Sequence, residues 1–363
     1  IITNWTCRVD RVIIGIHGLK NKPPEKVLKD WWLLSINDGL AAVSLPQIPF
    51  SFELLYWADL FYSKPLDVKI TDDKNPLYLS NPYKKISPPP YSMINLRKLR
   101  SRERIERMED QLFKNDFILR GFEDIADRLV KYIFNDLDSY LTNKTGLGDA
   151  QHRPARDIIL ERLGNLLYKY RNKKVMIIAH SMGSIITYDL LMQPDSSFKI
   201  NTLITLGSPL GQPTLMDKFA PENPVLTKMK TPEGVSKWIN SADLYDIIAL
   251  DPTLGDDYAP NSQGVLPEDI FIDNRYTWEG SKNAHAVYGY LQTPAVARRV
   301  YDFILKDRSK ASQLIMHAES WIFNNLFRVN DIRRKRSPSR SERQKKVQSK
   351  RSKTQEFEHQ AST

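Results

Sequence analysis

The stretch Lys174–Thr187, KVMIIAHSMGSIIT, decides the fold of this chain. Its first part is a run of apolar, partly β-branched residues, which predicts a short and fully buried strand over 174–179. Its second part predicts a helix over 184–191, which ends before Pro194. The chain must therefore turn from a buried strand into a helix within very few residues.

The turn between this strand and this helix holds a serine at its apex. Ser181 has Ala179 and Gly183 as small neighbours, which is the pattern G-x-S-x-G with alanine in the first glycine position. Such a turn lifts the apex side chain clear of the sheet and directs the N-terminus of the helix at whatever binds there. The pattern predicts a nucleophilic serine, and the alternative is a tight turn with a purely structural role.

Strands and helices alternate on both sides of this turn. Apolar runs predict further strands over 11–16, 52–62, 199–206, 235–240 and 269–273. Helical spacing of apolar residues predicts helices over 25–40, 119–141, 155–170, 296–305 and 309–328. This alternation predicts an α/β fold, with a mostly parallel sheet that is covered by helices on both faces.

Two segments interrupt the alternation. The stretch over 64–90 is rich in Pro, Asn, Asp and Ser and predicts an irregular excursion, and a basic helix is predicted within 95–115. Residues 333–363 contain eleven Lys or Arg, three Glu and almost no apolar residues, so we expect a disordered basic tail. The folded domain is therefore expected to span residues 1–332.

The charge and the cysteine content limit the classes of function. The chain of 363 residues has a formal net charge of +10, but +8 of this belongs to the tail. The nearly neutral folded part gives no indication of specific nucleic-acid binding, although the tail or the basic helix could contact a membrane surface weakly. The single cysteine, Cys7, fits a reducing, cytoplasmic compartment, and no apolar run approaches the ~18 residues of a membrane span. We find no dinucleotide or phosphate-loop motif and no Cys/His cluster, and expect no cofactor and no metal.

A serine hydroxyl needs a base that removes its proton, and histidine is the usual one. The six histidines are His17, His152, His180, His285, His317 and His359. His285 is favoured because it follows the last predicted strand, and loops at the carboxyl ends of parallel strands carry the chemistry of such sheets. His17 is expected to shape the loop after the strand 11–16, and His180 to point away from the turn.

The base needs a carboxylate that orients it, and the segment after the predicted strand 235–240 offers Asp243, Asp246 and Asp251. Asp246 is favoured because Ile247 and Ile248 follow it directly and would shield its side chain from solvent. Asp243 remains the alternative, and the one that is not the acid is expected to cap a turn.

An oxyanion that develops during acyl transfer needs two N–H donors. The backbone N–H of Met182, directly after the serine, is one candidate. The loop after the strand 11–16 supplies the other, and we expect it from Leu19. Gly18 would let this loop approach closely, with His17 supporting it.

The order Ser181, Asp246, His285 and the motifs around these residues resemble the α/β-hydrolase superfamily, in particular its lipase and esterase branch. The resemblance is closest to uncharacterised bacterial hydrolases of that branch and covers roughly residues 8–306. It rests on Gly15-Ile16-His17-Gly18, Ala179-His180-Ser181-Met182-Gly183, Gly207-Ser208-Pro209, Trp238-Ile239-Asn240 with Asp246, and His285.

Two departures from that family affect the expected fold. The strand that leads to the His-Gly loop begins near residue 11, so the first two strands of the family are missing and about six are expected. Residues 65–118 are inserted where a cap over the active site would lie. The basic helix within this insertion is either part of such a cap or a solvated surface helix.

The resemblance implies a serine hydrolase that cleaves carboxylic esters through an acyl-enzyme intermediate. Several apolar residues near the motifs favour a lipid or acyl ester as substrate: Leu19, Trp31, Trp32, Trp57 and Tyr258. The alternative is a catalytically silent α/β-hydrolase fold that serves as a binding or scaffold protein, because a fold does not determine a function. The sequence gives no indication of the oligomeric state.

Overall fold

The structure is a computed structural model. It describes residues 10–45, 50–86, 153–212, 228–249 and 251–306, together with the single positions 137, 140, 308, 310, 313, 314 and 318. Contacts divide the chain into two compact units, Ile1–Leu45 with Phe50–Lys306, and Pro46–Pro49 with Asp307–Thr363. All elements below belong to the first unit. The predicted basic helix and the predicted tail lie outside the described residues, as do most of the predicted helices 119–141 and 309–328.

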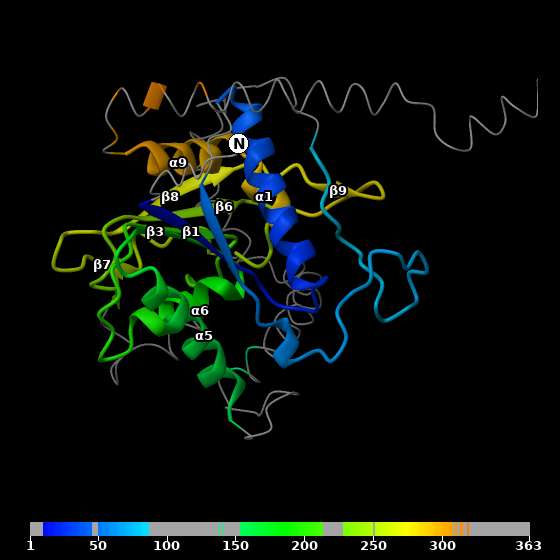
Figure 1. Ribbon diagram of the computed structural model, residues 1–363, viewed down its shortest axis with the longest axis horizontal. Helices are drawn as coiled ribbons and strands as arrows, with labels where there is room; N and C mark the ends of the chain where they lie inside the picture. The colour runs from blue at the N-terminus through cyan, green and yellow to red at the C-terminus, as the bar shows by residue number, and fades with distance from the viewer. Residues whose placement is uncertain are drawn as a thin grey trace, which may run out of the picture. The chain divides into compact units, whose positions relative to one another are not determined.

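A six-stranded sheet forms the centre of this unit, in the order β2-β1-β3-β4-β6-β8 (Figure 1). Its strands are β1 (Arg11–Ile16), β2 (Ser51–Leu55), β3 (Lys174–His180), β4 (Thr202–Leu206), β6 (Trp238–Asp243) and β8 (Pro267–Ile272). Every neighbouring pair is parallel. β1, β4 and β6 are buried along their whole length, as is typical of parallel strands that are covered on both faces. The predicted α/β fold with about six parallel strands is confirmed.

Helices cover both faces of the sheet. α5 (Ala155–Lys169) and α6 (Met182–Leu191) lie together below the sheet in Figure 1, and α9 (Pro294–Leu305) lies above it. α1 (Glu25–Ala42) packs against α9 and against the short helix α8 (Val287–Leu291). The remaining elements are the 3-10 helix η1 (Ala58–Leu60) and two small ladders, β5 (Met229–Lys230) with β7 (Tyr258–Ala259), and β9 (Thr277–Trp278) with β10 (Ser281–Lys282).

Several elements differ from their predicted bounds by a few residues, and the differences in β6 and α6 bear on the site. β6 runs from Trp238 to Asp243 rather than from residue 235 to residue 240. Val235 forms only an isolated bridge with Ile200. α6 begins at Met182, directly after the serine. The predicted strand 52–62 ends at Leu55. It ends because the Trp57 N–H donates to Nε2 of His17 (3.1 Å) instead of extending the ladder.

An ion pair between a half-buried arginine and a buried aspartate fixes α6, the helix that begins directly after the serine, against α5. The Arg156 guanidinium donates to both carboxylate oxygens of Asp189, at 2.7 and 2.6 Å. The Tyr140 hydroxyl donates to the same carboxylate (2.8 Å). Because two oxygens of one carboxylate are held at once, the position of α6 relative to α5 is tightly restrained.

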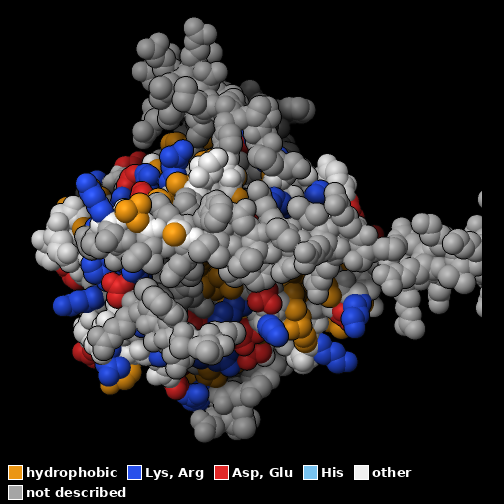
Figure 2. Space-filling view, turned by 45° about the horizontal axis from the view of Figure 1, so that its top comes forward, with side chains coloured by type: hydrophobic (Ala, Val, Ile, Leu, Met, Phe, Trp, Pro, Cys, Tyr) orange, Lys and Arg blue, Asp and Glu red, His pale blue; other side chains and the backbone are white. Residues whose placement is uncertain are grey.

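The surface carries charges of both signs. On the face that Figure 2 shows, lysine and arginine side chains lie among aspartate and glutamate side chains. Exposed ion pairs such as Arg162 with Asp59 (2.8 Å) and Arg299 with Glu268 (2.7 Å) are part of this pattern. The mixture agrees with the nearly neutral charge of the part of the sequence that precedes the tail.

Candidate active site

The turn at Ser181 is strained and well anchored. Ser181 has φ 55° and ψ −126°, in the positive-φ region that non-glycine residues rarely occupy. Its N–H donates to the carbonyl oxygen of Leu206 at the end of β4 (3.0 Å), which ties the turn to the neighbouring strand. A backbone conformation of this kind costs about 1–3 kcal/mol and persists only where the surroundings impose it, as they often do at functional sites.

The glycines around the turn allow a close approach of β1. A Cβ atom on Gly183 would lie 2.5 Å from the carbonyl oxygen of Ile16, the last residue of β1. A Cβ atom on Gly18 would lie 2.7 Å from the Cβ atom of Ser181. Only glycine fits at these two positions, so the loop after β1 lies directly against the serine.

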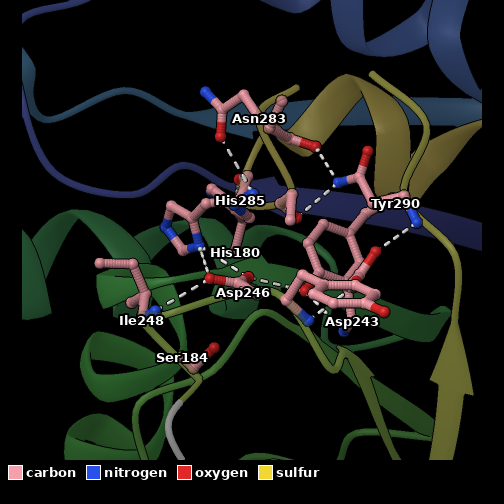
Figure 3. Close-up of polar contacts among 12 residues, drawn as sticks. His180, Ser184, Asp243, Asp246, Ile248, Asn283, His285 and Tyr290 are labelled. Atoms are coloured by element: carbon pink, nitrogen blue, oxygen red, sulfur yellow. Dashed lines mark hydrogen bonds and ion pairs between the residues drawn. The ribbon is translucent and has the colours of Figure 1, made fainter. Parts of the chain in front are cut away.

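His285 and Asp246 form a hydrogen-bonded pair (Figure 3). Nδ1 of His285 lies 2.9 Å from Oδ1 and 2.8 Å from Oδ2 of Asp246. The side chain of Asp246 is completely buried, and its oxygens also accept the Ile248 N–H (3.0 Å) and the Tyr290 hydroxyl (2.7 Å). Because a carboxylate only accepts, Nδ1 carries the proton, and Nε2 of a neutral His285 is then free to act as a base.

Asp243 has a different set of partners. Its Oδ1 accepts the Tyr245 N–H (2.8 Å) and its Oδ2 accepts the Asn274 N–H (2.5 Å). Burial raises the pKa of this carboxyl group, and the two N–H donors oppose that effect. Asp243 thus holds the ends of β6 and β8 together. The third candidate, Asp251, accepts the N–H of Thr253.

Asn274 and Tyr290 support the pair, and neither was predicted from the sequence. The Asn274 amide donates to the carbonyl oxygens of Ala284 (2.8 Å) and Ala286 (2.9 Å), the two neighbours of His285. Tyr290 accepts the Asp243 N–H (3.0 Å) and donates to Asp246. Gly289 makes room for this arrangement, since a Cβ atom there would lie 1.6 Å from Oδ1 of Asn274. The only signal for Asn274 in the sequence was its place, as a polar residue, in the loop that holds the candidate base His285.

Gly207 separates the Asp246–His285 pair from the end of β4. It has φ 51°, and a Cβ atom there would lie 2.5 Å from Oδ2 of Asp246 and 3.1 Å from Nδ1 of His285. Since the Ser181 N–H bonds to Leu206, the residue before Gly207, the serine and the pair both lie next to the end of β4.

We predict that Gly207→Ala displaces this pair. The methyl group would overlap with Asp246, and a shift of about 1 Å at a reacting group can lower the rate by roughly 100-fold. The positive φ adds about 1–2 kcal/mol of strain. Ester turnover and melting temperature of the variant would test the prediction, with Gly264→Ala as control, because Gly264 also has a positive φ but its Cβ would meet nothing within 4 Å. Equal turnover in both variants would contradict it.

His17 contacts Gly18 in the loop after β1 and Trp57 after β2 through hydrogen bonds and ring stacking. Its ring stacks on Trp57 with centroids 4.7 Å apart, and the Trp57 indole N–H donates to the carbonyl oxygen of His17 (3.1 Å). Because Nε2 accepts the Trp57 backbone N–H, Nδ1 carries the proton and donates to the Gly18 carbonyl oxygen (2.8 Å). The Lys22 ammonium donates to the carbonyl oxygen of Leu19, the residue expected to contribute an oxyanion donor.

We predict that the burial of His17 makes the free energy of unfolding sensitive to acid. Burial, and next the charge of Lys22, lower the pKa of His17 from 6.5 to about 3. Between pH 6.5 and pH 3 the unfolded chain binds a proton at His17 that the folded chain does not. The free energy of unfolding therefore falls as the pH drops below 6.5, by about 2 kcal/mol between pH 7 and pH 5. Denaturant unfolding at both pH values would measure it. His17→Gln should have a smaller pH dependence, and an unchanged one would contradict the assignment.

The residues that were expected to favour an apolar substrate are mostly core residues. Trp32, Trp57 and Tyr258 are at most 2% exposed. Tyr258 packs edge-on against Trp238 (5.0 Å between centroids). These three side chains therefore stabilise the domain and do not line a substrate site. Leu19 and Trp31 are half-buried.

The described part of the insertion 65–118 is hydrogen-bonded to the loop that carries His285. The Asn283 amide donates to Asn81 (3.0 Å), and the carbonyl oxygen of Asn283's side chain accepts the His285 N–H (3.0 Å). The Tyr276 hydroxyl and the Gln292 amide donate to the carbonyl oxygens of Pro82 (2.5 Å) and Lys84 (3.0 Å). The insertion thus contacts the segment around the predicted base through residues 81–84. Its residues 87–118 lie outside the described residues, so the predicted cap stays a prediction.

A family model described as "PGAP1-like alpha/beta domain" matches residues 158–224. The match contains most of α5, then β3, Ser181, α6 and β4. It supports an α/β-hydrolase-like family of the lipase and esterase type, and a hydrolase in the general sense. It does not extend to the narrower resemblance to bacterial serine hydrolases. No curated protein matches the chain significantly. Among the described helices, none is both long and apolar enough to cross a membrane.

Proposed function

We propose that this chain is a serine hydrolase that cleaves carboxylic esters, with Ser181 as nucleophile, His285 as base and Asp246 as the orienting acid. The observation that carries the proposal is the Asp246–His285 pair, in which Nδ1 is held within 2.9 Å of both carboxylate oxygens. A histidine held in this way presents Nε2 as a proton acceptor. The strained Ser181 turn at the adjacent strand end supports the same conclusion.

The proposed reaction follows from these roles. His285 Nε2 takes the proton of the Ser181 hydroxyl as its oxygen attacks the ester carbonyl carbon. The backbone N–H groups of Met182 and Leu19 stabilise the oxyanion, and the protonated His285 then donates its proton to the departing alcohol. A water that His285 deprotonates then attacks the acyl carbon, the bond to the Ser181 oxygen breaks, and His285 returns the proton to that oxygen as the acid leaves. Throughout, Asp246 stabilises the imidazolium ion without accepting its proton.

The substrate class is the less constrained part of the proposal. The family match supports a hydrolase of the lipase and esterase type, and lipid or acyl esters are our proposal for its substrates. The burial of Trp32, Trp57 and Tyr258 removes one argument for an apolar acyl chain. A series of p-nitrophenyl esters of graded chain length would determine the preferred acyl length.

A fluorophosphonate probe tests the proposed function, because it reacts only with an activated serine. We expect stoichiometric labelling of the wild-type chain and none of Ser181→Ala. Ser184→Ala is the matched control: Ser184 lies in the first turn of α6, and its hydroxyl donates only to the Ala179 carbonyl oxygen (3.2 Å). An unlabelled wild-type chain would favour the alternative, a catalytically silent binding or scaffold protein.

A further inference from the structure

His180, the residue before the predicted nucleophile, was expected to point away from the turn. Its side chain instead lies beside His285. Its Nε2 atom lies 2.8 Å from the carbonyl oxygen of His285, and the two rings are 4.6 Å apart between centroids (Figure 3). The reason is the alternation of side chains along β3. Val175, Ile177 and Ala179 belong to the core cluster that contains the buried residues of α5 and α6, so His180 faces the opposite side of the sheet.

The partners of His180 determine its tautomer. A carbonyl oxygen only accepts, so Nε2 of His180 carries the proton and donates a hydrogen bond to the carbonyl oxygen of His285. Nδ1 is then an acceptor, and it lies 3.1 Å from the place that a Cβ atom on Gly18 would occupy. His180 is only 8% exposed, and burial, followed by the neighbouring His285, lowers its pKa well below the usual value. The ring is therefore neutral at physiological pH and remains a donor through Nε2.

Besides the local bond of its N–H to the Asn283 side chain, His285 is restrained from three directions. Asp246 holds Nδ1 of its ring, and Asn274 holds the carbonyl oxygens of the residues on either side. The third restraint is the bond from His180 to the carbonyl oxygen of His285 itself. Of these three, only His180 is covalently adjacent to Ser181. The other two fix His285 relative to the loops after β6 and β8.

We propose that His180 is a positioning residue that sets the distance between the base His285 and the nucleophile Ser181. It does so through its Nε2–H bond to the His285 backbone and through contact between the two rings. The inference rests on the proposed function. Proton transfer from a serine to a histidine needs the two groups within hydrogen-bond distance, and a misplacement of about 1 Å can cost roughly 100-fold in rate.

Two variants separate the hydrogen bond from the packing. His180→Phe keeps a planar ring beside His285 but has no donor. His180→Gln has a side-chain amide N–H in place of the Nε2–H. We expect His180→Phe to lower kcat and the rate constant of fluorophosphonate labelling by roughly 10- to 100-fold. KM should change less than about three-fold, since the proposed role concerns the chemical step. His180→Gln should recover most of the lost rate.

The fraction of molecules that is finally labelled distinguishes positioning from folding. Positioning predicts complete labelling at a slower rate, with a melting temperature close to that of the wild type. The inference is wrong if His180→Phe reacts as fast as the wild type, or if the labelled fraction falls in proportion to the rate. If the wild type itself is not labelled, the proposed function fails, which is a different outcome.

A measurement on the unmodified chain covers the case in which His180→Phe does not fold. Nitrogen-15 NMR of the histidine side chains distinguishes the two neutral tautomers. We expect one neutral histidine that stays in the Nε2–H form from pH 5 to pH 8, and that loses its signal in His180→Gln. An Nδ1–H tautomer would overturn the inference, because Nε2 could then not donate a hydrogen bond to the carbonyl oxygen of His285.

Discussion

Ser181→Ala should lower ester turnover by roughly 10⁴- to 10⁶-fold, which is the usual effect of losing the serine of such a triad. The fold should not suffer. The bond that anchors the turn comes from the Ser181 backbone N–H to Leu206 and is retained in the variant. Alanine also meets the same positive φ as serine, so the strain of the turn hardly changes. The measurement is steady-state turnover of a p-nitrophenyl ester beside a thermal melt.

The control for this prediction is Ser184→Ala, which removes a neighbouring hydroxyl from the same helix. It should retain turnover, since its hydroxyl donates to the Ala179 carbonyl oxygen, which has no role in the proposed reaction. A Ser181→Ala variant that keeps more than about a tenth of wild-type turnover would exclude Ser181 from the mechanism. Equal losses in both variants would indicate damage to the turn rather than loss of a nucleophile.

Asp246→Asn should lower kcat by roughly 10⁴-fold and leave KM nearly unchanged. The amide keeps the shape of the carboxylate but carries no negative charge. It can also bond to the ring in a way that places the proton on Nε2, where the base must be free. Both oxygens of Asp246 lie within 2.9 Å of Nδ1 of His285. Among the described contacts no other carboxylate bonds to this atom, so none would orient the ring in its place.

Asp243→Asn is the matched comparison and should act mainly on stability. Both oxygens of Asp243 accept backbone N–H groups, from Tyr245 and Asn274. In the variant one of these N–H groups faces an NH₂ group and loses its acceptor, which costs about 1–3 kcal/mol in a buried place. Denaturant unfolding and turnover per folded molecule would separate the two effects. If Asp243→Asn is inactive but stable, the two aspartates have exchanged roles.

The sequence predicts most of the fold because the information is local. The strands 11–16 and 174–180 are nearly continuous apolar runs, and a strand that is buried on both faces needs such a run. The helices 25–42 and 155–169 follow from their apolar spacing in the same way. The strand 238–243 was misplaced by three residues, since the apolar Val235 precedes it but forms only an isolated bridge.

The site was predictable only in part. Ser181 could be identified because a small-residue turn between a strand and a helix is a local pattern. The two aspartates could not be separated with certainty, because both lie just after a predicted strand and are three residues apart. Their partners distinguish them: Asp246 contacts His285, 39 residues away, and Asp243 contacts Asn274, 31 residues away.

The sequence by itself determined the parallel α/β sheet and the serine at the turn between β3 and α6, because apolar periodicity and small residues act over a few neighbouring positions. Only the tertiary structure decided what surrounds His285. Tyr290 bonds to Asp246 across 44 residues, and His180 bonds to His285 across 105. Such contacts form when loops from separate strands meet at one edge of the sheet, and no local pattern records which polar side chain will meet which partner there.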